Sequence, residues 1–354
     1  MPQNMNRITM LWALAASFFL VMGGCAGKDA PRVDTALPPL LEDAAFLENI
    51  GRSGKLGAKG ITIVAPSSGF SENGARKIHV IANALGVKFP AASLNRNAVP
   101  YHANSDEARL QFLAGALADP GTEVVWAALG GYGSSRLLEG LANLPAPSGK
   151  KIVIGYSDIT FLHLYFQKLG WRTIHAPLFG ELASSRKDTD NFRRLAELLA
   201  GRVDMLRYDG LVPCNDAAEK LARPLRGVVT GGNLACVTAA LGTPWALDAS
   251  GKILFLEDVK EPGYKIDRMF TQLQGAGLVK NARAVILGTF TVGDENTPFA
   301  LERFAKTCPI PVFKSDLFGH GKKNYPLIFN APAVLEKIPG SNEARISIRA
   351  DMLP

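Results

Sequence analysis

The sequence predicts an α/β protein with two folded domains, an amino-terminal open sheet of parallel strands followed by a second α/β domain. The chain has 354 residues, of which 47% are hydrophobic, so it can bury a sizeable core. Short, continuously apolar runs alternate with runs whose apolar residues have helical spacing. Such continuously apolar strands are typical of parallel sheets that are covered on both faces.

Residues 1–25 have the layout of an export signal, because one arginine in MPQNMNR precedes the apolar run ITMLWALAASFFLVM and GGCAG follows. The run is shorter than the ~20 residues that a spanning helix needs. VMGGC is similar to the bacterial lipoprotein box, which implies a lipid on Cys25; an ordinary cleavable signal is the alternative. Ala26 and Gly27 stand where inner-membrane lipoproteins typically carry aspartate, so we expect an exported protein anchored on the periplasmic side, preferentially in the outer membrane.

The next two segments predict a tether and the first domain. Residues 26–57 contain three prolines, several charges and a stretch rich in glycine and lysine, which indicates a flexible tether. Residues 58–180 hold three predicted strands, in GITIVAP, TEVVWAAL and KIVIGYS, and two predicted helices, in ENGARKIHVIANALGV and SDEARLQFLAGALAD. We expect them to form the open sheet with its covering helices.

The remainder predicts a connector and a second domain. Residues 181–225 are rich in charge and contain one amphipathic helical segment, DNFRRLAELLAG, so we interpret them as a connector with one helix. Residues 226–354 again alternate strand and helix patterns, with strands in KILFLEDV, ARAVILGTF and ARISI. No internal repeat is present.

Charge and cysteine content exclude some function classes. The net charge of +7 favours acidic surroundings, such as cell-wall polymers or anionic lipids, but the basic residues are scattered and no nucleic-acid-binding pattern occurs. Cys214, Cys236 and Cys308 are far apart and have no metal-ligand spacing, so we expect no metal. Export would permit one disulfide among them, and Cys236 fits a buried free thiol.

Ser157 is the candidate nucleophile, in KIVIGYSDITFLHLYF. A serine in a tight turn after a strand has its hydroxyl lifted clear of the sheet. Gly155 precedes it by two residues, whereas Ile159 stands where the GxSxG pattern has its second glycine. Capping of a helix that begins at Asp158 is therefore the alternative role for Ser157.

A serine nucleophile needs a base, and the chain has five histidines. His79 and His163 fall in helical patterns and fit structural roles, while His102 and His175 lie near loops and stay open. His320 is the best candidate because its two flanking glycines permit a sharp turn.

Two further motifs complete the candidate site. Glu257 ends the apolar strand KILFLEDV, where ligand crevices form in α/β sheets, and we expect Asp258 to be an exposed strand terminus. GGYGSS, residues 130–135, lies between a strand and a helix. Its spacing does not match nucleotide-binding loops, so backbone N–H groups that hold an oxyanion or a carboxylate fit better.

The ordered motifs GGYGS, IGYSD, GGNL, LEDV, LGTF and GHG resemble those of the serine LD-carboxypeptidases, or muramoyltetrapeptide carboxypeptidases, a family that includes microcin C immunity proteins. The resemblance covers about residues 58–340. It implies a catalytic triad of Ser157 as nucleophile, Glu257 as orienting acid and His320 as base, in a cleft between the two domains.

The resemblance also implies a binding site and a substrate. Backbone N–H groups of Asp158 and Gly131 would hold the oxyanion, and Gly130 and Asn233 would contact the substrate. The implied reaction removes the terminal D-alanine of a murein tetrapeptide without metal or organic cofactor, and a homodimer is compatible with it. Leu129 stands where relatives usually carry arginine.

Two other functions stay open. A hydrolase of peptide-nucleotide antibiotics, like the immunity proteins, keeps the same site but acts in the cytoplasm. A catalytically idle lipoprotein that binds murein would not need the triad.

Overall fold

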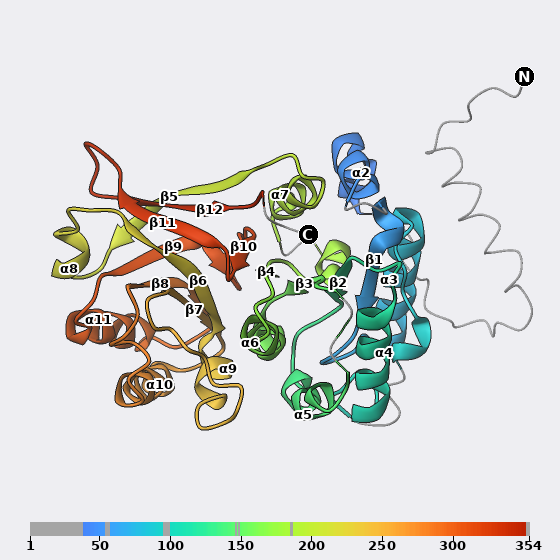
Figure 1. Cartoon of the computed structure of the whole chain (residues 1–354), viewed down its shortest axis with the longest axis horizontal. Coiled ribbons are helices and arrows are strands. Elements are labelled where there is room, and N and C mark those ends of the chain that lie inside the picture. The colour runs from blue at the N-terminus through green and yellow to red at the C-terminus, as the bar shows by residue number, and fades with distance from the viewer. Residues whose placement is uncertain are drawn as a thin grey trace, which may run out of the picture.

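The computed structural model describes residues 38–53, 57–94, 100–145, 147, 149–184 and 187–351. Cys25 and the rest of the predicted signal therefore lie outside the described residues. Figure 1 shows two lobes side by side, one built on an open sheet and one on a barrel. This arrangement confirms the predicted fold class.

The first lobe contains a five-stranded sheet in the order β1-β2-β3-β4-β10. Its strands are β1 (Ile61–Val64), β2 (Val124–Ala127), β3 (Ile152–Gly155), β4 (Thr173–His175) and β10 (Leu327–Phe329). The first four are parallel, and β10 is antiparallel to β4 although it comes from the carboxyl-terminal part of the chain. Nearly every residue of these strands is buried, as expected for a parallel sheet between helices.

Helices follow the strands of this sheet. They are α3 (Glu72–Leu85), α4 (Asp106–Ala118), α5 (Leu138–Ala142) and α6 (Thr160–Lys168). Ser71 and Ser105 cap the first two, accepting hydrogen bonds from the backbone of Gly74 and Ala108. Both helices lie where the apolar spacing predicted them.

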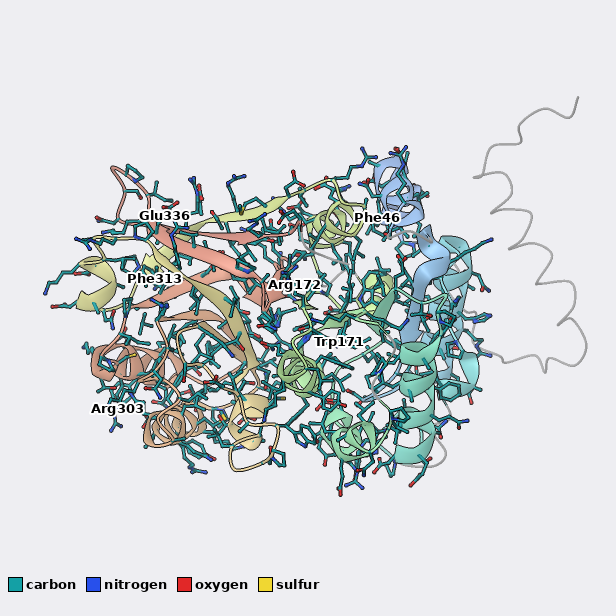
Figure 2. The ribbon with its side chains drawn as sticks, viewed as in Figure 1. Phe46, Trp171, Arg172, Arg303, Phe313 and Glu336 are labelled. Atoms are coloured by element: carbon teal, nitrogen blue, oxygen red, sulfur yellow. The ribbon has the colours of Figure 1, made fainter. Side chains whose placement is uncertain are left out.

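The second lobe is a closed barrel with strand order β11-β12-β5-β9-β8-β7-β6. Its strands are β5 (Met205–Pro213), β6 (Leu225–Asn233), β7 (Ile253–Val259), β8 (Ala284–Thr291), β9 (Val312–Gly319), β11 (Pro332–Lys337) and β12 (Ala344–Arg349). β6 to β9 are parallel neighbours. The remaining helices of this lobe are α8 (Asp216–Glu219), α9 (Leu234–Ala239), α10 (Gly263–Gly275) and α11 (Thr297–Thr307). Phe313 lies buried inside the barrel (Figure 2).

The two lobes share one hydrophobic cluster, which contains residues of both the sheet and the barrel. His175 of β4, Phe255 of β7 and Phe329 of β10 pack their rings together at this junction, with centroids 5.0 to 6.3 Å apart. Because the core is continuous, the carboxyl ends of β3 and β7 have fixed positions relative to each other.

The segment expected to be a connector contributes to both lobes. α7 (Thr189–Leu199) lies where one helix was predicted. β5, however, was not predicted as a strand, although the alternation of buried Leu206 and Tyr208 with exposed Arg207 and Asp209 is the pattern of a half-buried strand.

Part of the expected flexible tether is packed on the body. Residues Pro39–Glu42 form a 3₁₀ helix, and α2 (Ala44–Gly51) packs against α7. Phe46 and Ile50 of α2 are each 1% exposed (Figure 2). The prediction of a flexible tether is wrong for residues 38–51. Their prolines and charges are typical of loops, but the apolar side chains of the amphipathic helix are buried and stabilise it.

Candidate active site

Ser157 lies at the second position after β3, in a turn where its own backbone conformation is energetically costly. Its φ is 63°, in the left-handed region, which costs a residue other than glycine roughly 1–2 kcal/mol. Ser157 begins a 3₁₀ helix, Ser157–Ile159, which leads into α6, and it makes no side-chain cap for that helix. The capping role is therefore not what the structure shows.

Gly155 and Ile159 explain why the second glycine of the GxSxG pattern is not needed. A Cβ on Gly155 would lie 2.9 Å from Cγ1 of Ile159 and 3.1 Å from Cβ of Ala127. The buried Ile159 side chain fills the space that the missing Cβ leaves. The close packing at this turn comes from one glycine and one isoleucine.

Asp158 anchors the turn through its side chain. Its Oδ2 accepts hydrogen bonds from Oγ of Ser67 at 2.5 Å and from the backbone N–H of Ser134 at 2.8 Å. Oγ of Ser134 donates to the backbone oxygen of Asp158. These bonds join the ends of β1, β2 and β3, and they hold the residue next to Ser157 so that the strained turn persists.

The GGYGSS turn lies directly against Ser157. A Cβ on Gly130 would lie 3.0 Å from Cβ and 3.2 Å from Oγ of Ser157, and a Cβ on Gly131, whose φ is 99°, would lie 2.2 Å from Oγ of Ser68. Glycine is therefore required at both positions. The two predicted binding glycines and the candidate nucleophile form one surface.

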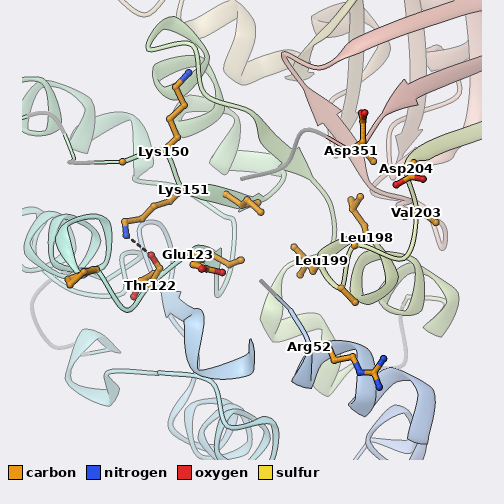
Figure 3. A pocket seen from close by; sticks show the side chains of 17 residues that line it. Arg52, Thr122, Glu123, Lys150, Lys151, Leu198, Leu199, Val203, Asp204 and Asp351 are labelled. Carbon is orange, nitrogen blue, oxygen red and sulfur yellow. Dashed lines mark hydrogen bonds between the residues drawn. The ribbon is translucent and has the colours of Figure 1, made fainter. Parts of the chain in front are cut away.

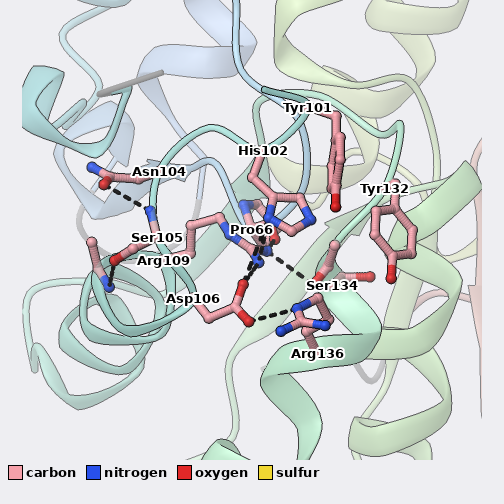
Figure 4. Close-up of polar contacts among 12 residues, drawn as sticks. Pro66, Tyr101, His102, Asn104, Ser105, Asp106, Arg109, Tyr132, Ser134 and Arg136 are labelled. Atoms are coloured by element: carbon pink, nitrogen blue, oxygen red, sulfur yellow. Dashed lines mark hydrogen bonds and ion pairs between the residues drawn. The ribbon is translucent and has the colours of Figure 1, made fainter. Parts of the chain in front are cut away.

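A buried arginine supports this turn from behind (Figure 4). Arg109, 1% exposed, donates to the backbone oxygens of Gly133, at 2.9 Å, and of Pro66. His102 stacks on Tyr132, with ring centroids 5.4 Å apart. Burial and the charge of Arg109 lower the pKa of His102, so this histidine fits a structural role.

Glu257 and His320 are joined by a hydrogen bond between their side chains. Oε2 of Glu257 lies 2.6 Å from Nδ1 of His320. Glu257 is fully buried, and its Oε1 has no hydrogen-bond partner among the described residues. Because an ionised carboxylate only accepts, Nδ1 of His320 carries the proton and Nε2 is left as the free base.

Glycines allow these two side chains to meet. Gly319 has a φ of 108°, and a Cβ there would lie 2.9 Å from Oε2 of Glu257. A Cβ on Gly288 would lie 3.1 Å from Cβ of the same glutamate. The flanking glycine of the GHG motif is thus needed for the approach of His320 to Glu257.

Tyr156 adjoins a candidate residue of each lobe, Ser157 and His320. Its ring centroid lies 4.6 Å from that of His320, and it directly precedes Ser157. Sγ of Cys236, at the start of α9 in the barrel lobe, donates to the backbone oxygen of Ser157 at 3.8 Å. His320 of the barrel lobe therefore contacts the residue that precedes Ser157, and α9 of the same lobe contacts Ser157 itself.

Asp258 differs from its expected role, and Asn233 is bonded to it. Asp258 is 3% exposed, not an exposed strand terminus, and burial together with the charge of Glu257 raises its pKa to about 6. Asn233 donates from Nδ2 to Oδ1 of Asp258 at 2.9 Å, and its Oδ1 caps α9. Its side chain is thus engaged within the protein, because the parallel pairing of β6 with β7 places it beside this carboxylate.

The other histidines and the cysteines have structural surroundings. His163 is buried in α6 with Nε2 2.9 Å from the backbone oxygen of Gly155. His175 is also buried, and burial lowers its pKa far below the ordinary value. Cys236 is half-buried rather than buried, and burial of its thiol group raises its pKa. The three described cysteines, Cys214, Cys236 and Cys308, are free.

A cavity of about 570 Å³ lies at the opposite, amino-terminal ends of β2 and β3 (Figure 3). Arg52, Thr122, Lys151 and Asp351 are among its lining residues. Nζ of Lys151 donates to the backbone oxygens of Asp119, at 2.7 Å, and of Thr122. The cavity is separate from the Ser157 site, which lies at the carboxyl ends of the strands.

The described residues also bear on membrane insertion and metal binding. No described helix is both long and apolar enough to cross a membrane. No group of three or more histidine, cysteine, aspartate or glutamate side chains in the described part of the chain could hold a metal ion.

Comparisons with known proteins agree with the motifs. Residues 61–176 match the model of the LD-carboxypeptidase N-terminal domain, and residues 226–335 match that of the C-terminal domain. A putative carboxypeptidase of Rickettsia conorii is 40% identical over 278 residues, which cover 78% of this chain and 88% of the relative. The chain belongs to the LD-carboxypeptidase family.

Further relatives and solved structures extend this match. The murein tetrapeptide carboxypeptidase of Pseudomonas aeruginosa is 33% identical over 252 residues, 67% of this chain and 80% of that one. The crystal structure of muramoyltetrapeptide carboxypeptidase from Oxalobacter formigenes has a TM-score of 0.70 at 25% identity and covers 82% of this chain and 98% of its own. A microcin C7 self immunity protein in complex with aspartyl sulfamoyl adenosine, with a TM-score of 0.68 at 21% identity, covers 82% of this chain and 96% of its own; it shares the fold.

The sequence analysis missed three residues that support the candidate site. Ser67 and Ser134 bond Asp158, and Lys187 bonds the backbone on both sides of His320. The serines stand in PSSG and GGYGSS, which mark strand ends, whereas Lys187 stands in the charged connector and carries no local signal.

Proposed function

We propose that this chain is a serine LD-carboxypeptidase that removes the terminal D-alanine from murein tetrapeptides. The observation that carries the proposal is the hydrogen bond between Glu257 and His320, 2.6 Å long, beside the strained turn of Ser157. A nucleophile, a base and an orienting acid are the parts that acyl transfer by a serine requires. The match to murein tetrapeptide carboxypeptidases supports the choice of substrate.

In the proposed reaction, Oγ of Ser157 attacks the carbonyl carbon of the last peptide bond while Nε2 of His320 takes the hydroxyl proton. Backbone N–H groups of Asp158 and Gly131 stabilise the oxyanion. The C–N bond then breaks, and His320 gives its proton to the amino group of the leaving D-alanine. Water attacks the resulting ester with His320 again as base, which frees the tripeptide and regenerates Ser157. Glu257 stabilises the imidazolium in both steps.

The test is release of D-alanine from a purified murein tetrapeptide by residues 26–354. We expect Ser157→Ala to abolish release, with a loss on the order of 10⁴-fold or more, because the nucleophile is gone. Ser250→Ala, in an exposed loop of the barrel lobe, is the matched control and should keep full activity. An active Ser157→Ala protein would falsify the proposal.

The same assay separates the alternatives. Hydrolysis of an aminoacyl sulfamoyl adenosine without release of D-alanine would favour the antibiotic hydrolase. Tight binding of muropeptides by a protein that releases nothing would favour the idle binding protein.

We also propose that the protein is exported and anchored by a lipid on Cys25, on the periplasmic side of the outer membrane. The lipoprotein-like motif supports this proposal. Since α2 is packed on the body, only residues 26–37 separate Cys25 from the first described residue, and a chain of that length spans at most about 40 Å.

Labelling of cells with an alkyne-bearing fatty acid tests the anchor. The full chain should take up the label and sediment with outer membranes, Cys25→Ser should do neither, and Cys214→Ser is the control that keeps both. Label on the Cys25→Ser protein would overturn the anchor. Sedimentation equilibrium of the soluble body tests whether it forms a homodimer.

A further inference from the structure

Lys187 is a buried lysine that contacts the turn on both sides of His320. It lies between the 3₁₀ helix Phe179–Ala183 and α7, in the part of the chain that leads from the sheet to the barrel. Its Nζ donates to the backbone oxygens of Gly319 at 2.9 Å and of Gly321 at 2.8 Å. Lys187 is 7% exposed. Burial of a charged side chain costs free energy unless neighbouring groups compensate the charge.

The ammonium group of Lys187 also contacts the residue that precedes Ser157. It lies over the ring of Tyr156, 4.9 Å from the centroid, and Tyr156 directly precedes Ser157. The hydroxyl of Tyr156 is 2.8 Å from Oε1 of Glu181, which fixes the ring. An ammonium group has three N–H donors, and two carbonyls with one aromatic face account for them.

The charges around Lys187 compensate its burial in part. Burial lowers the pKa of Lys187, and the carboxylates of Glu181 and Glu257 oppose that effect. His320 itself is faced by Glu257 of β7, by Tyr156, and by the turn that Lys187 holds. Lys187 also acts on His175, whose pKa its charge lowers further. Lys187 is the cation that faces Glu257 from the connector.

Other bonds make the His320 turn rigid on its remaining sides. Oγ1 of Thr289 accepts from the backbone of Gly321 at 3.0 Å, and Oδ1 of Asn324 accepts from that of Gly319 at 2.9 Å. Among the described side chains named here, Lys187 is the one that bonds to both glycines and the one that carries a charge.

We propose that Lys187 is a positioning residue for the general base: it fixes the His320 turn against the Ser157 turn through two hydrogen bonds and the ring of Tyr156. The inference rests on the proposed serine mechanism. Because a nearby cation disfavours an imidazolium, removal of the charge should change the pH profile of the reaction as well as the geometry of the turn.

Two variants separate geometry from charge. Lys187→Gln keeps N–H donors and removes the charge, so the acid limb of the kcat/KM profile should move to higher pH by roughly 0.5–1 unit. Lys187→Arg keeps the charge in a larger group that fits the two carbonyls less well. Its acid limb should stay in place while kcat falls about 10- to 100-fold, as small displacements of a catalytic group do. KM should change little in both, because Lys187 is buried and its ammonium group is engaged by two backbone oxygens and the ring of Tyr156.

The assay is D-alanine release from a murein tetrapeptide between pH 5 and 9, with circular dichroism to show that each variant is folded. Lys322→Met, an exposed lysine in the same turn, is the matched control and should behave as the wild type. A folded Lys187→Gln protein with the wild-type acid limb and kcat would overturn the inference. Wild-type protein that releases no D-alanine would instead overturn the proposed function.

Discussion

Replacement of Glu257 by glutamine should separate activity from stability. The side chain is fully buried, bonds His320 through one oxygen and leaves the other without a partner among the described residues. Glutamine has nearly the same volume, so it removes the charge without leaving a cavity. An amide in this place can donate to Nδ1 of His320, which would put the ring proton on Nε2 and block the base.

The two effects have opposite signs. Activity should fall about 10⁴-fold, or roughly 5 kcal/mol of transition-state stabilisation at about 1.4 kcal/mol per factor of ten. Stability should rise by about 1 kcal/mol at neutral pH, because each side chain leaves one polar atom without a partner and a buried neutral amide costs less than a buried carboxylate. The charge of Glu257 also raises the pKa of Asp258, so its removal relieves repulsion between two neighbouring carboxylates.

Urea unfolding and D-alanine release, both at pH 7.5, measure the two effects on one preparation. Glu302→Gln, an exposed substitution on α11, is the control and should change neither quantity. A Glu257→Gln protein that keeps more than about a tenth of the wild-type rate would refute the orienting role of Glu257. A loss of stability beyond about 2 kcal/mol would show instead that its charge supports the fold.

Three further predictions follow from burial and exposure. Burial lowers the pKa of His163 from 6.5 to about 4. The free energy of unfolding should therefore fall by up to about 3 kcal/mol as the pH drops from 6.5 to 4, because the unfolded chain binds a proton at this histidine and the folded chain does not. His163→Gln should flatten that decline in urea unfolding. Phe46→Ala should cost roughly 3–5 kcal/mol and Phe46→Leu clearly less, whereas equal small losses would mean that α2 is not docked. Tyr132, 47% exposed beside Gly131, should contact the substrate, so Tyr132→Ala should raise KM several-fold while the distant Tyr264→Ala leaves it unchanged.

Local patterns were enough for most of the first lobe. The apolar runs and helical spacing placed β1, β2, β3, α3 and α4, because each of these elements buries a face that its own residues define. The same patterns missed α2 and β5. Both are short or mixed in composition, and each is stabilised by segments far away in the chain. α2 packs on α7, and β5 pairs with β9 and β12.

The candidate site divides in the same way. Glycines and motif order indicated Ser157, Glu257 and His320, because sharp turns at strand ends have a local signature and the family motifs are local as well. The burial of Asp258 and the capping role of Asn233 could not be seen locally, since they follow from the pairing of β6 with β7.

By itself, the sequence determined that this chain alternates strands and helices, that Ser157 follows a buried strand, and that His320 stands between two glycines. Only the tertiary structure decided that Glu257 meets His320 at 2.6 Å and that Lys187 bonds the His320 turn. It also decided that the ring of Tyr156 contacts both His320 and Lys187. The physical reason is that a residue's neighbours along the chain set its backbone conformation. Its charge partners come from whichever distant segments the shared core brings together.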